Sequence, residues 1–351
     1  MMNAEHAAGE TAGSPSAGQA TGITATPNPL APFLDEQGYL ILDGALATEL
    51  ERRGADLHDA LWSAKLLIED PGLITQVHLS YLSAGADVIS TASYQATVQG
   101  FLSRGFSSDE GARLLRLSVE LAVKARDRFW ADEANRKGRL RPLVAASIGP
   151  YGAYLANGSE YTGDYGLSEP ELVEFHCPRM EILAGTQTDL FAFETIPSLV
   201  EARAIAALLR DYPDKRAWIA FSCRDGQHVC HGERLSECAS VADASPEIIA
   251  AGINCTAPEY IASLIAEAVM GTGKPIVVYP NSGEGWDSAA GEWTGGAELM
   301  GIAAHAVTWH GAGANLIGGC CRTTPRDIAA LRFALQAASP PSAPPNRAGA
   351  A

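Results

Sequence analysis

The sequence predicts a single-domain α/β protein of the (β/α)8 TIM barrel class, with disordered N-terminal and C-terminal tails. Three observations support this fold. Eight short apolar runs rich in β-branched residues recur along the chain, helical patterns separate most of them, and no linker divides the region that they occupy. Strands that are covered on both faces of a parallel sheet are continuously apolar in this way. A doubly wound open sheet is the competing fold, because it is built from the same alternation.

The two tails set the expected limits of the domain. Residues 1–34 are rich in Ala, Gly, Ser, Thr and Pro, and residues 339–351 have a similar composition. Such segments bury too little apolar surface to order themselves. We therefore expect a disordered N-terminal extension over 1–34, a barrel over 35–338 and a disordered tail over 339–351. A barrel of about 250 residues with insertions accounts for the middle part.

Strands and helices are expected to alternate along the barrel. The strands are expected over residues 39–43, 86–91, 142–149, 190–195, 217–223, 249–255, 275–280 and 314–320. A proline in the first turn and Gly85 at the end delimit a helix over 71–85. Ser107 and the acidic residues after it begin a helix over 107–130. Further helices are expected over 198–212, 257–271, 296–311 and 324–338.

Charge and composition exclude several classes of partner. The formal net charge of the 351-residue chain is −16 at pH 7, and no basic stripe is present, so we expect no nucleic-acid partner. No apolar run has the length of a membrane span, and the first residues lack the features of a secretory signal, so we expect no membrane association. Seven scattered cysteines without such a signal predict a reducing, cytoplasmic compartment.

Polar residues end most of the expected strands. They are Asp43, residues 91–94, Glu194 with Thr195, Asn254 with Cys255, residues 279–281 and residues 318–321. The functional residues of a TIM barrel lie at the carboxyl ends of its strands, around one rim. A barrel without a function has no need of this pattern, so we expect a functional site at that rim.

Three cysteines belong to this set of strand-end residues. Cys255 ends the sixth expected strand, and the adjacent Cys320 and Cys321 end the eighth. In a closed barrel these two strand ends lie two strands apart on one rim, so the three sulfurs are able to converge. Three thiolates around one ion, with a fourth position open, predict a zinc site. We expect Gly318 and Gly319 to supply the conformational freedom that two adjacent ligands need. The alternative is that these cysteines are small buried hydrophobic residues.

A second group of possible metal ligands lies in the loop after the fifth expected strand. The segment "CRDGQHVCHGERL" contains Cys223, His228, Cys230 and His231, in a spacing that is unusual for a metal site. A polar, glycine-containing loop is the simpler interpretation of this segment. Cys177 and Cys238 are interpreted as packing or surface residues.

Seven stretches of the chain resemble one known family. They are "ILDGALATELERRGADL", "LWSAKLLIEDPGLITQVHLSYLSAGADVISTASYQAT", "SIGPYGAYLANGSEYTGDY", "FETIPSLVEA", "GINCTAPEYI", "VYPNSGEGWD" and "LIGGCCRTTPRDI". In this order, over residues 38 to 335, they resemble the homocysteine S-methyltransferase family. The distance along the chain between Cys255 and Cys320 suits its shorter branch, which uses S-methylmethionine or S-adenosylmethionine as the donor. "CHGERL" departs from the Asp-Gly-Thr-like turn that the family has after the fifth strand.

The resemblance implies an activity and a set of site residues. It implies a zinc-dependent transfer of a methyl group from S-methylmethionine or S-adenosylmethionine to the thiol of L-homocysteine, which forms methionine. Cys255, Cys320 and Cys321 would be the zinc ligands and the catalytic residues. Asp43 and Glu194 would bind the substrate ammonium. Thr48, Tyr94, Asn254 and Asn281 are weaker candidates for substrate binding, and each is also explained as a structural polar group. We expect the "SEYTGDYG" segment to form a loop over the mouth of the barrel.

Several alternatives remain open at the level of the sequence. The same chemistry with betaine or methylfolate as the donor is one, and a non-catalytic barrel that binds zinc or a thiol amino acid is another. A redox switch at the adjacent cysteines is a third, although a disulfide between neighbours needs a strained turn. The sequence does not discriminate between the two sulfonium donors, between a monomer and a dimer, or between homocysteine and selenohomocysteine as the substrate.

Overall fold

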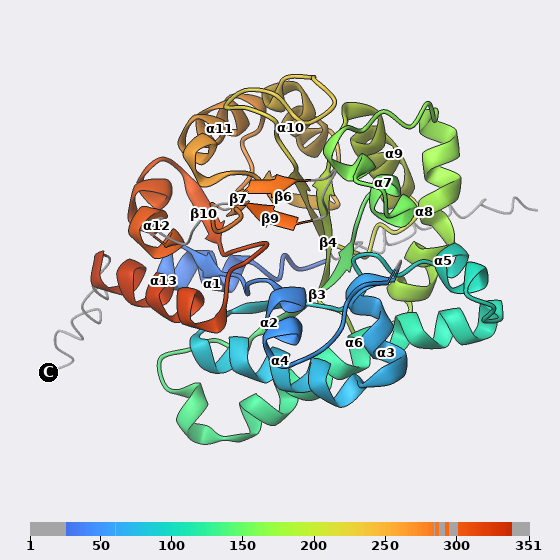
Figure 1. Cartoon of the computed structure of the whole chain (residues 1–351). Coiled ribbons are helices and arrows are strands. Elements are labelled where there is room, and N and C mark those ends of the chain that lie inside the picture. The colour runs from blue at the N-terminus through green and yellow to red at the C-terminus, as the bar shows by residue number, and fades with distance from the viewer. Residues whose placement is uncertain (1–25, 60, 284, 288–291, 295–300, 339–351) are drawn as a thin grey trace, which may run out of the picture.

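Eight parallel strands form a closed barrel at the centre of the protein (Figure 1). The computed structural model describes residues 26–59, 61–283, 285–287, 292–294 and 301–338. The barrel strands are β1 (Leu40–Ile41), β2 (Val88–Ser90), β3 (Leu143–Ile148), β4 (Leu190–Ile196), β5 (Ala217–Phe221), β6 (Ile248–Asn254), β7 (Ile276–Tyr279) and β10 (Ala314–Ile317). Their order in the sheet is β1-β10-β7-β6-β5-β4-β3-β2, and a parallel bridge between Leu42 and Val88 joins the two end strands. The predicted (β/α)8 barrel is therefore confirmed, and the open sheet is wrong.

A long helix follows each barrel strand, and these helices surround the barrel (Figure 1). They are α4 (Pro71–Ala84), α6 (Ser108–Ala131), α8 (Glu169–Ala184), α9 (Leu199–Leu209), α10 (Leu235–Asp243), α11 (Pro258–Gly271), α12 (Ile302–Gly311) and α13 (Pro325–Ala338). The predicted Ser107 cap is present, because Ser107 and Glu110 form a reciprocal capping box at the start of α6. The expected helices do not include α8, which contains Pro178, or the nine-residue α10.

Shorter elements occupy the connections. They are α2 (Leu46–Arg52), η1 (Trp62–Lys65) and α3 (Leu66–Glu69) after β1, α5 (Val98–Ser103) after β2, η2 (Glu133–Arg136) before β3, and α7 (Tyr151–Leu155) and η3 (Ser159–Tyr161) after β3. An antiparallel pair, β8 (Gly285–Asp287) and β9 (Glu292–Thr294), follows β7. The helix expected over 296–311 begins at Ile302 within the described residues, and 295–300 lie outside them.

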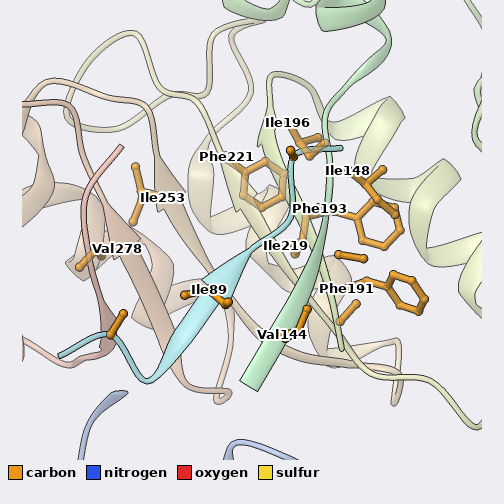
Figure 2. Close-up of a cluster of buried hydrophobic side chains, with 14 of the residues drawn as sticks. Ile89, Val144, Ile148, Phe191, Phe193, Ile196, Ile219, Phe221, Ile253 and Val278 are labelled. Carbon is orange, nitrogen blue, oxygen red and sulfur yellow. The ribbon is translucent and has the colours of Figure 1, made fainter. Parts of the chain in front are cut away.

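Alternating side chains of the strands fill two separate layers. The outward layer, between strands and helices, includes Ile89, Val144, Ile148, Phe191, Phe193, Ile219, Phe221, Ile253 and Val278 (Figure 2). The inward layer, inside the barrel, includes Leu40, Leu42, Val88, Ala145, Leu190, Ala192, Trp218, Ala220, Ala250, Val277 and Leu316. Successive residues of a strand point to opposite faces, so the two apolar layers explain why the predicted strands lack polar alternation. At the carboxyl ends, the inward positions pass to polar residues such as Ser147, Glu194 and Asn254.

The N-terminal helix α1 (Ala31–Gln37) packs against the inner layer of the barrel. Leu30 and Phe33 are buried in the same cluster as the inward side chains of the strands. Gly38 ends the helix in the left-handed conformation that favours glycine. The predicted extension over 1–34 is therefore wrong for residues 26–34, because these two apolar side chains anchor that part of the chain. The expected disorder of residues 1–25 and 339–351 concerns residues outside the described part of the chain.

No helix in the described residues is both long enough and apolar enough to cross a membrane.

A buried histidine on α4 is expected to make the stability of the protein depend on pH. His78 is fully buried, and neither ring nitrogen has a hydrogen-bond partner among the described residues. Burial lowers its pKa from 6.5 to about 4. The unfolded chain therefore takes up the proton first, and stability present above pH 6.5 is lost as the pH falls towards 4. Between pH 7.5 and 5 the wild type should lose about 2 kcal/mol more unfolding free energy than His78→Leu.

Urea denaturation at the two pH values measures this difference. The same substitution at the exposed His58 is the control and should leave the pH dependence as it is in the wild type. Equal losses in the wild type and in His78→Leu would show that His78 is not the source.

Candidate functional site

Three thiols converge at the carboxyl rim of the barrel. Cys255 follows β6, and Cys320 and Cys321 follow β10, with β7 between the two strands. The three sulfur atoms lie within 4.8 Å of one another, and the Cys255 and Cys321 sulfurs are 3.6 Å apart. The rim geometry of a barrel thus brings together the residues that the sequence analysis singled out as candidate metal ligands.

The backbone around the cysteines is held in unusual conformations. Thr195, Cys255 and Arg322 have φ angles of 62°, 48° and 68°, and each lies at or just beyond the carboxyl end of a barrel strand. Non-glycine residues rarely adopt this region, and such strain of about 1–3 kcal/mol concentrates at functional sites. The backbone N–H of Cys255 bonds Tyr279 O, and that of Cys320 bonds Pro280 O, so both cysteines are fixed to the end of β7.

Gly318 and Gly319 have a different role from the one expected. Neither has a positive φ angle. A Cβ atom on Gly318 would lie 2.6 Å from Leu42 Cβ, and one on Gly319 would lie 2.4 Å from Thr323 Oγ1. The expectation of conformational freedom is therefore wrong. The glycines are needed because the strand end before the cysteines passes too close to β1 and to Thr323 for a side chain.

The three thiols share their protons unequally. Hydrogen bonds from Cys320 and Cys321 hold the pKa of Cys255 well below its usual range, and the same contacts raise the pKa values of Cys320 and Cys321. Tyr161 from η3 adds a contact of 3.2 Å between its hydroxyl and the Cys255 sulfur. The hydrogen bonds of the cluster thus favour the thiolate form at Cys255 over that at its two neighbours.

Asp43 and Glu194 form an acidic pair beside the thiols. Burial raises the pKa of Asp43 to about 8, despite a hydrogen bond of 2.8 Å from the Ser90 N–H, and the charge of Glu194 raises it further. Burial also raises the pKa of Glu194 to about 7. The buried Asp43 carboxyl and the half-buried Glu194 carboxyl repel each other when both are ionised, so a cation beside them would be bound favourably.

A hydrogen-bonded chain inside the barrel positions Glu194, and the sequence analysis did not foresee it. Ser147 donates to Glu194, as does Tyr279, whose hydroxyl accepts a 3.1 Å hydrogen bond from the Trp218 indole. Trp218 and Tyr279 lie in the inward layer. Ser147 and Tyr279 are polar residues at inward positions of otherwise apolar strands, and this was the signal in the sequence that could have indicated the hydrogen-bonded chain.

Thr48 and Asn254 are engaged by the protein itself. Thr48 Oγ1 accepts the backbone N–H of Arg322, just after the cysteine pair. Asn254 is fully buried, and its amide bonds both the N–H and the hydroxyl of Thr195, at 2.6 and 2.8 Å. Asn254 also donates to the Cys320 sulfur at 4.0 Å. These contacts hold the strained strand ends in place. Substrate binding by either residue stays a prediction.

Tyr94 and Asn281 lie in the same part of the site. The hydroxyl of Tyr94 hydrogen-bonds Thr195. Burial raises the pKa of this tyrosine, and the charges of Glu160 and Cys255 raise it further. The side chain of Asn281 hydrogen-bonds Cys255, and its Oδ1 atom is buried without a partner among the described residues. Asn281 thus presents an acceptor that a bound molecule could satisfy. Substrate binding by these two residues also stays a prediction.

The loop after β5 forms no second metal centre within the described residues. His228 contacts Asp225 at 3.0 Å, and His231 contacts Glu233 at 2.9 Å. Antiparallel bridges between Cys223 and Val229 and between His228 and Arg234 fold the segment back on itself. Within the described part of the chain, the trio of Cys255, Cys320 and Cys321 is the one group with metal-ligand geometry.

The fold and the site together define a class of protein, a TIM-barrel enzyme with a thiol centre at its catalytic rim. A family model described as homocysteine S-methyltransferase matches residues 40–335. The chain belongs to the homocysteine S-methyltransferase family, and it is an enzyme of the methyltransferase class. This confirms the family that the sequence motifs indicated.

Individual relatives agree with this assignment. Homocysteine S-methyltransferase YbgG of Bacillus subtilis is 54% identical over 301 residues, which cover 86% of this chain and 96% of the relative. Selenocysteine Se-methyltransferase of Brassica oleracea is 48% identical over 307 residues, which cover 84% and 88%. The crystal structure of the homocysteine methyltransferase MmuM from Escherichia coli, in its metallated form, has 48% identity and a TM-score of 0.78, and the match covers 87% of this chain and 99% of MmuM.

Proposed function

We propose that this enzyme transfers a methyl group from S-methylmethionine or S-adenosylmethionine to the thiol of L-homocysteine, with zinc held by Cys255, Cys320 and Cys321. The homocysteine sulfur gains the methyl group, and the donor leaves as a neutral thioether. The convergence of the three thiols at the barrel rim is the observation that carries this proposal. The membership of the family supports the choice of homocysteine as the acceptor.

The thiols suit a zinc ion in both spacing and chemistry. Four ligands at about 2.3 Å around a tetrahedral zinc lie about 3.8 Å from one another, and the Cys255 and Cys321 sulfurs are 3.6 Å apart. Sulfur ligands favour zinc over magnesium or calcium. Bound zinc with one open position would supply the chemistry that converts a thiol into a nucleophilic thiolate at neutral pH.

The chain's own residues would orient the acceptor. Asp43 and Glu194 would bind the α-ammonium of homocysteine, and the repulsion that Glu194 exerts on Asp43 supports this role because a bound cation relieves it. Ser147 and Tyr279 fix the direction of the Glu194 carboxylate. Holding two substrates in a reactive geometry supplies several kcal/mol of the rate enhancement.

Four other residues would complete the substrate contacts. Asn281 offers its buried, unpartnered Oδ1 atom to a donor on the substrate. Tyr94 would line the same mouth, and Thr48 and Asn254 would act mainly by fixing the loops that carry Arg322 and Thr195. We propose small molecules as the partners of this site and assign no macromolecular partner.

Metal analysis combined with a methionine-formation assay tests the proposed function. The purified chain should contain one zinc ion per molecule and form methionine from homocysteine with a sulfonium donor, offered separately as S-methylmethionine and S-adenosylmethionine. Activity should disappear after chelation and return with zinc. Betaine and methyltetrahydrofolate serve as control donors and should give no product. Full activity in metal-free protein, or turnover with the control donors alone, would contradict the proposal.

A further inference from the structure

Glu160 is a half-buried acidic residue near the thiol centre that the proposed acceptor site does not use. It lies in η3 (Ser159–Tyr161), on the connection between β3 and α8. Its Oε2 atom is fully buried and has no hydrogen-bond partner among the described residues. Burial raises the pKa of Glu160 to about 7, and the negative charge of Cys255 raises it further.

The segment that carries Glu160 is fixed against the site. The Ser222 hydroxyl at the end of β5 donates a 3.1 Å hydrogen bond to Glu160 O. A Cβ atom on Gly152 would lie 2.3 Å from Glu160 N, so α7 packs directly on this turn. The next residue, Tyr161, places its hydroxyl 3.2 Å from the Cys255 sulfur. The main chain at Glu160 is therefore held at the rim by a packed turn.

The Oε2 atom of Glu160 has no hydrogen-bond or ion-pair partner among the described residues, although the residue's own backbone N–H bonds the carboxylate. A buried carboxylate oxygen without a partner is costly, and protein structures normally pair it with a cation or with hydrogen-bond donors. The acidic group that most affects it is Cys255, which adds repulsion. Burial raises the pKa values of Tyr94 and Tyr165, and the charge of Glu160 contributes to both shifts, so Glu160 acts on the same part of the site as these two hydroxyls. An organic cation that binds beside Glu160 would offset the cost of its buried carboxylate oxygen.

The acidic residues of the site come from different parts of the barrel. Asp43 and Glu194 lie at the ends of β1 and β4, and the charge of Glu194 raises the pKa of Asp43. Glu160 lies on the connection after β3, and the charge of Cys255 raises its pKa, as it does that of Glu194. A transfer between two amino-acid-like substrates needs a place for the acceptor's ammonium and another for the donor's positive charge.

We infer that Glu160 binds the positively charged sulfonium of the methyl donor and thereby determines donor specificity. This inference rests on the proposed function. The sulfonium becomes a neutral thioether once its methyl group has moved to the acceptor sulfur, so the ion pair with Glu160 exists before transfer and is absent afterwards. The contact therefore contributes to donor binding and favours the release of the demethylated donor.

The test compares Glu160→Gln with the wild type, using the sulfonium donor that the wild type turns over fastest. At saturating homocysteine, the KM for the donor should rise at least 30-fold, because removing one partner of a buried charge pair commonly costs that much. The kcat should change less than threefold. The Kd of the same molecule without its methyl group should stay within threefold of the wild type, because that thioether has no sulfonium charge. Glu160→Asp, which keeps the charge, should restore most of the donor affinity.

Controls separate this role from a structural one. Asp164→Asn removes an exposed carboxylate from the same connection and should leave the donor KM unchanged. Zinc content and homocysteine affinity should be the same in Glu160→Gln as in the wild type. A donor KM within threefold of the wild type overturns the inference, and so does equal weakening of the sulfonium and the thioether. Failure of the wild type to use any sulfonium donor rejects the proposed function itself.

Discussion

Cys320→Ser is expected to abolish metal binding and methyl transfer together. Cys320 is one of three converging thiols, and a serine hydroxyl is a harder and far less acidic ligand that does not replace a thiolate. Loss of metal activation removes several kcal/mol of transition-state stabilisation, so turnover should fall by roughly 10³-fold or more. Zinc per chain by elemental analysis and the rate of methionine formation measure the two effects.

The fold should survive this substitution. Pro280 O accepts the backbone N–H of residue 320, and Cys320 O accepts a hydrogen bond from Thr323, so the main chain is held without the sulfur. Cys177→Ser is the matched control, since Cys177 is also half-buried but lies on α8, outside the trio. It should keep zinc and activity. A Cys320→Ser protein that turns over normally without metal would refute the proposed mechanism.

Glu194→Gln is expected to weaken homocysteine binding strongly while leaving the metal in place. The substitution keeps the shape of the side chain and removes the charge that we propose for the ammonium. Truncating one partner of a buried ion pair costs about 2–5 kcal/mol, which corresponds to an increase of about 30-fold or more in the homocysteine KM. Steady-state kinetics with homocysteine as the varied substrate measure this increase, and zinc analysis verifies the intact centre.

Ser147→Ala is the companion variant for Glu194. It removes one hydrogen-bond donor to the carboxylate and retains its charge, so the homocysteine KM should rise only about fivefold, the equivalent of about 1 kcal/mol. The donor KM should change little in either variant. If Glu194→Gln binds homocysteine as tightly as the wild type, Glu194 does not hold the ammonium.

The candidate site was partly visible in the sequence. Cys255 and the adjacent Cys320 and Cys321 could be singled out because strand-end cysteines after apolar runs are conspicuous and a barrel brings strand ends to one rim. Asp43 and Glu194 followed from the family resemblance and from their place at strand ends. Each of these inferences depends on short-range pattern and on the known geometry of a closed parallel sheet.

Other features of the site could not be predicted. Tyr161 reaches Cys255 across 94 positions of the chain, and the Oε2 atom of Glu160 is buried where η3 packs at the rim. The chain of Trp218, Tyr279 and Glu194 joins three strands inside the barrel. Contacts of this kind depend on how loops pack over the rim and on which inward side chains meet, and neither follows from local sequence.

The sequence by itself determined the barrel class, the family and the three thiols, because apolar periodicity and strand-end residues are local properties. It also suggested a terminal extension that was too long, since Leu30 and Phe33 look like part of a weakly apolar tail until the barrel that buries them is known. Only the tertiary structure shows why Gly318 and Gly319 must be glycines and where Glu160 lies. The physical reason is that close approach and burial arise between segments far apart in the chain, and packing, not propensity, sets them.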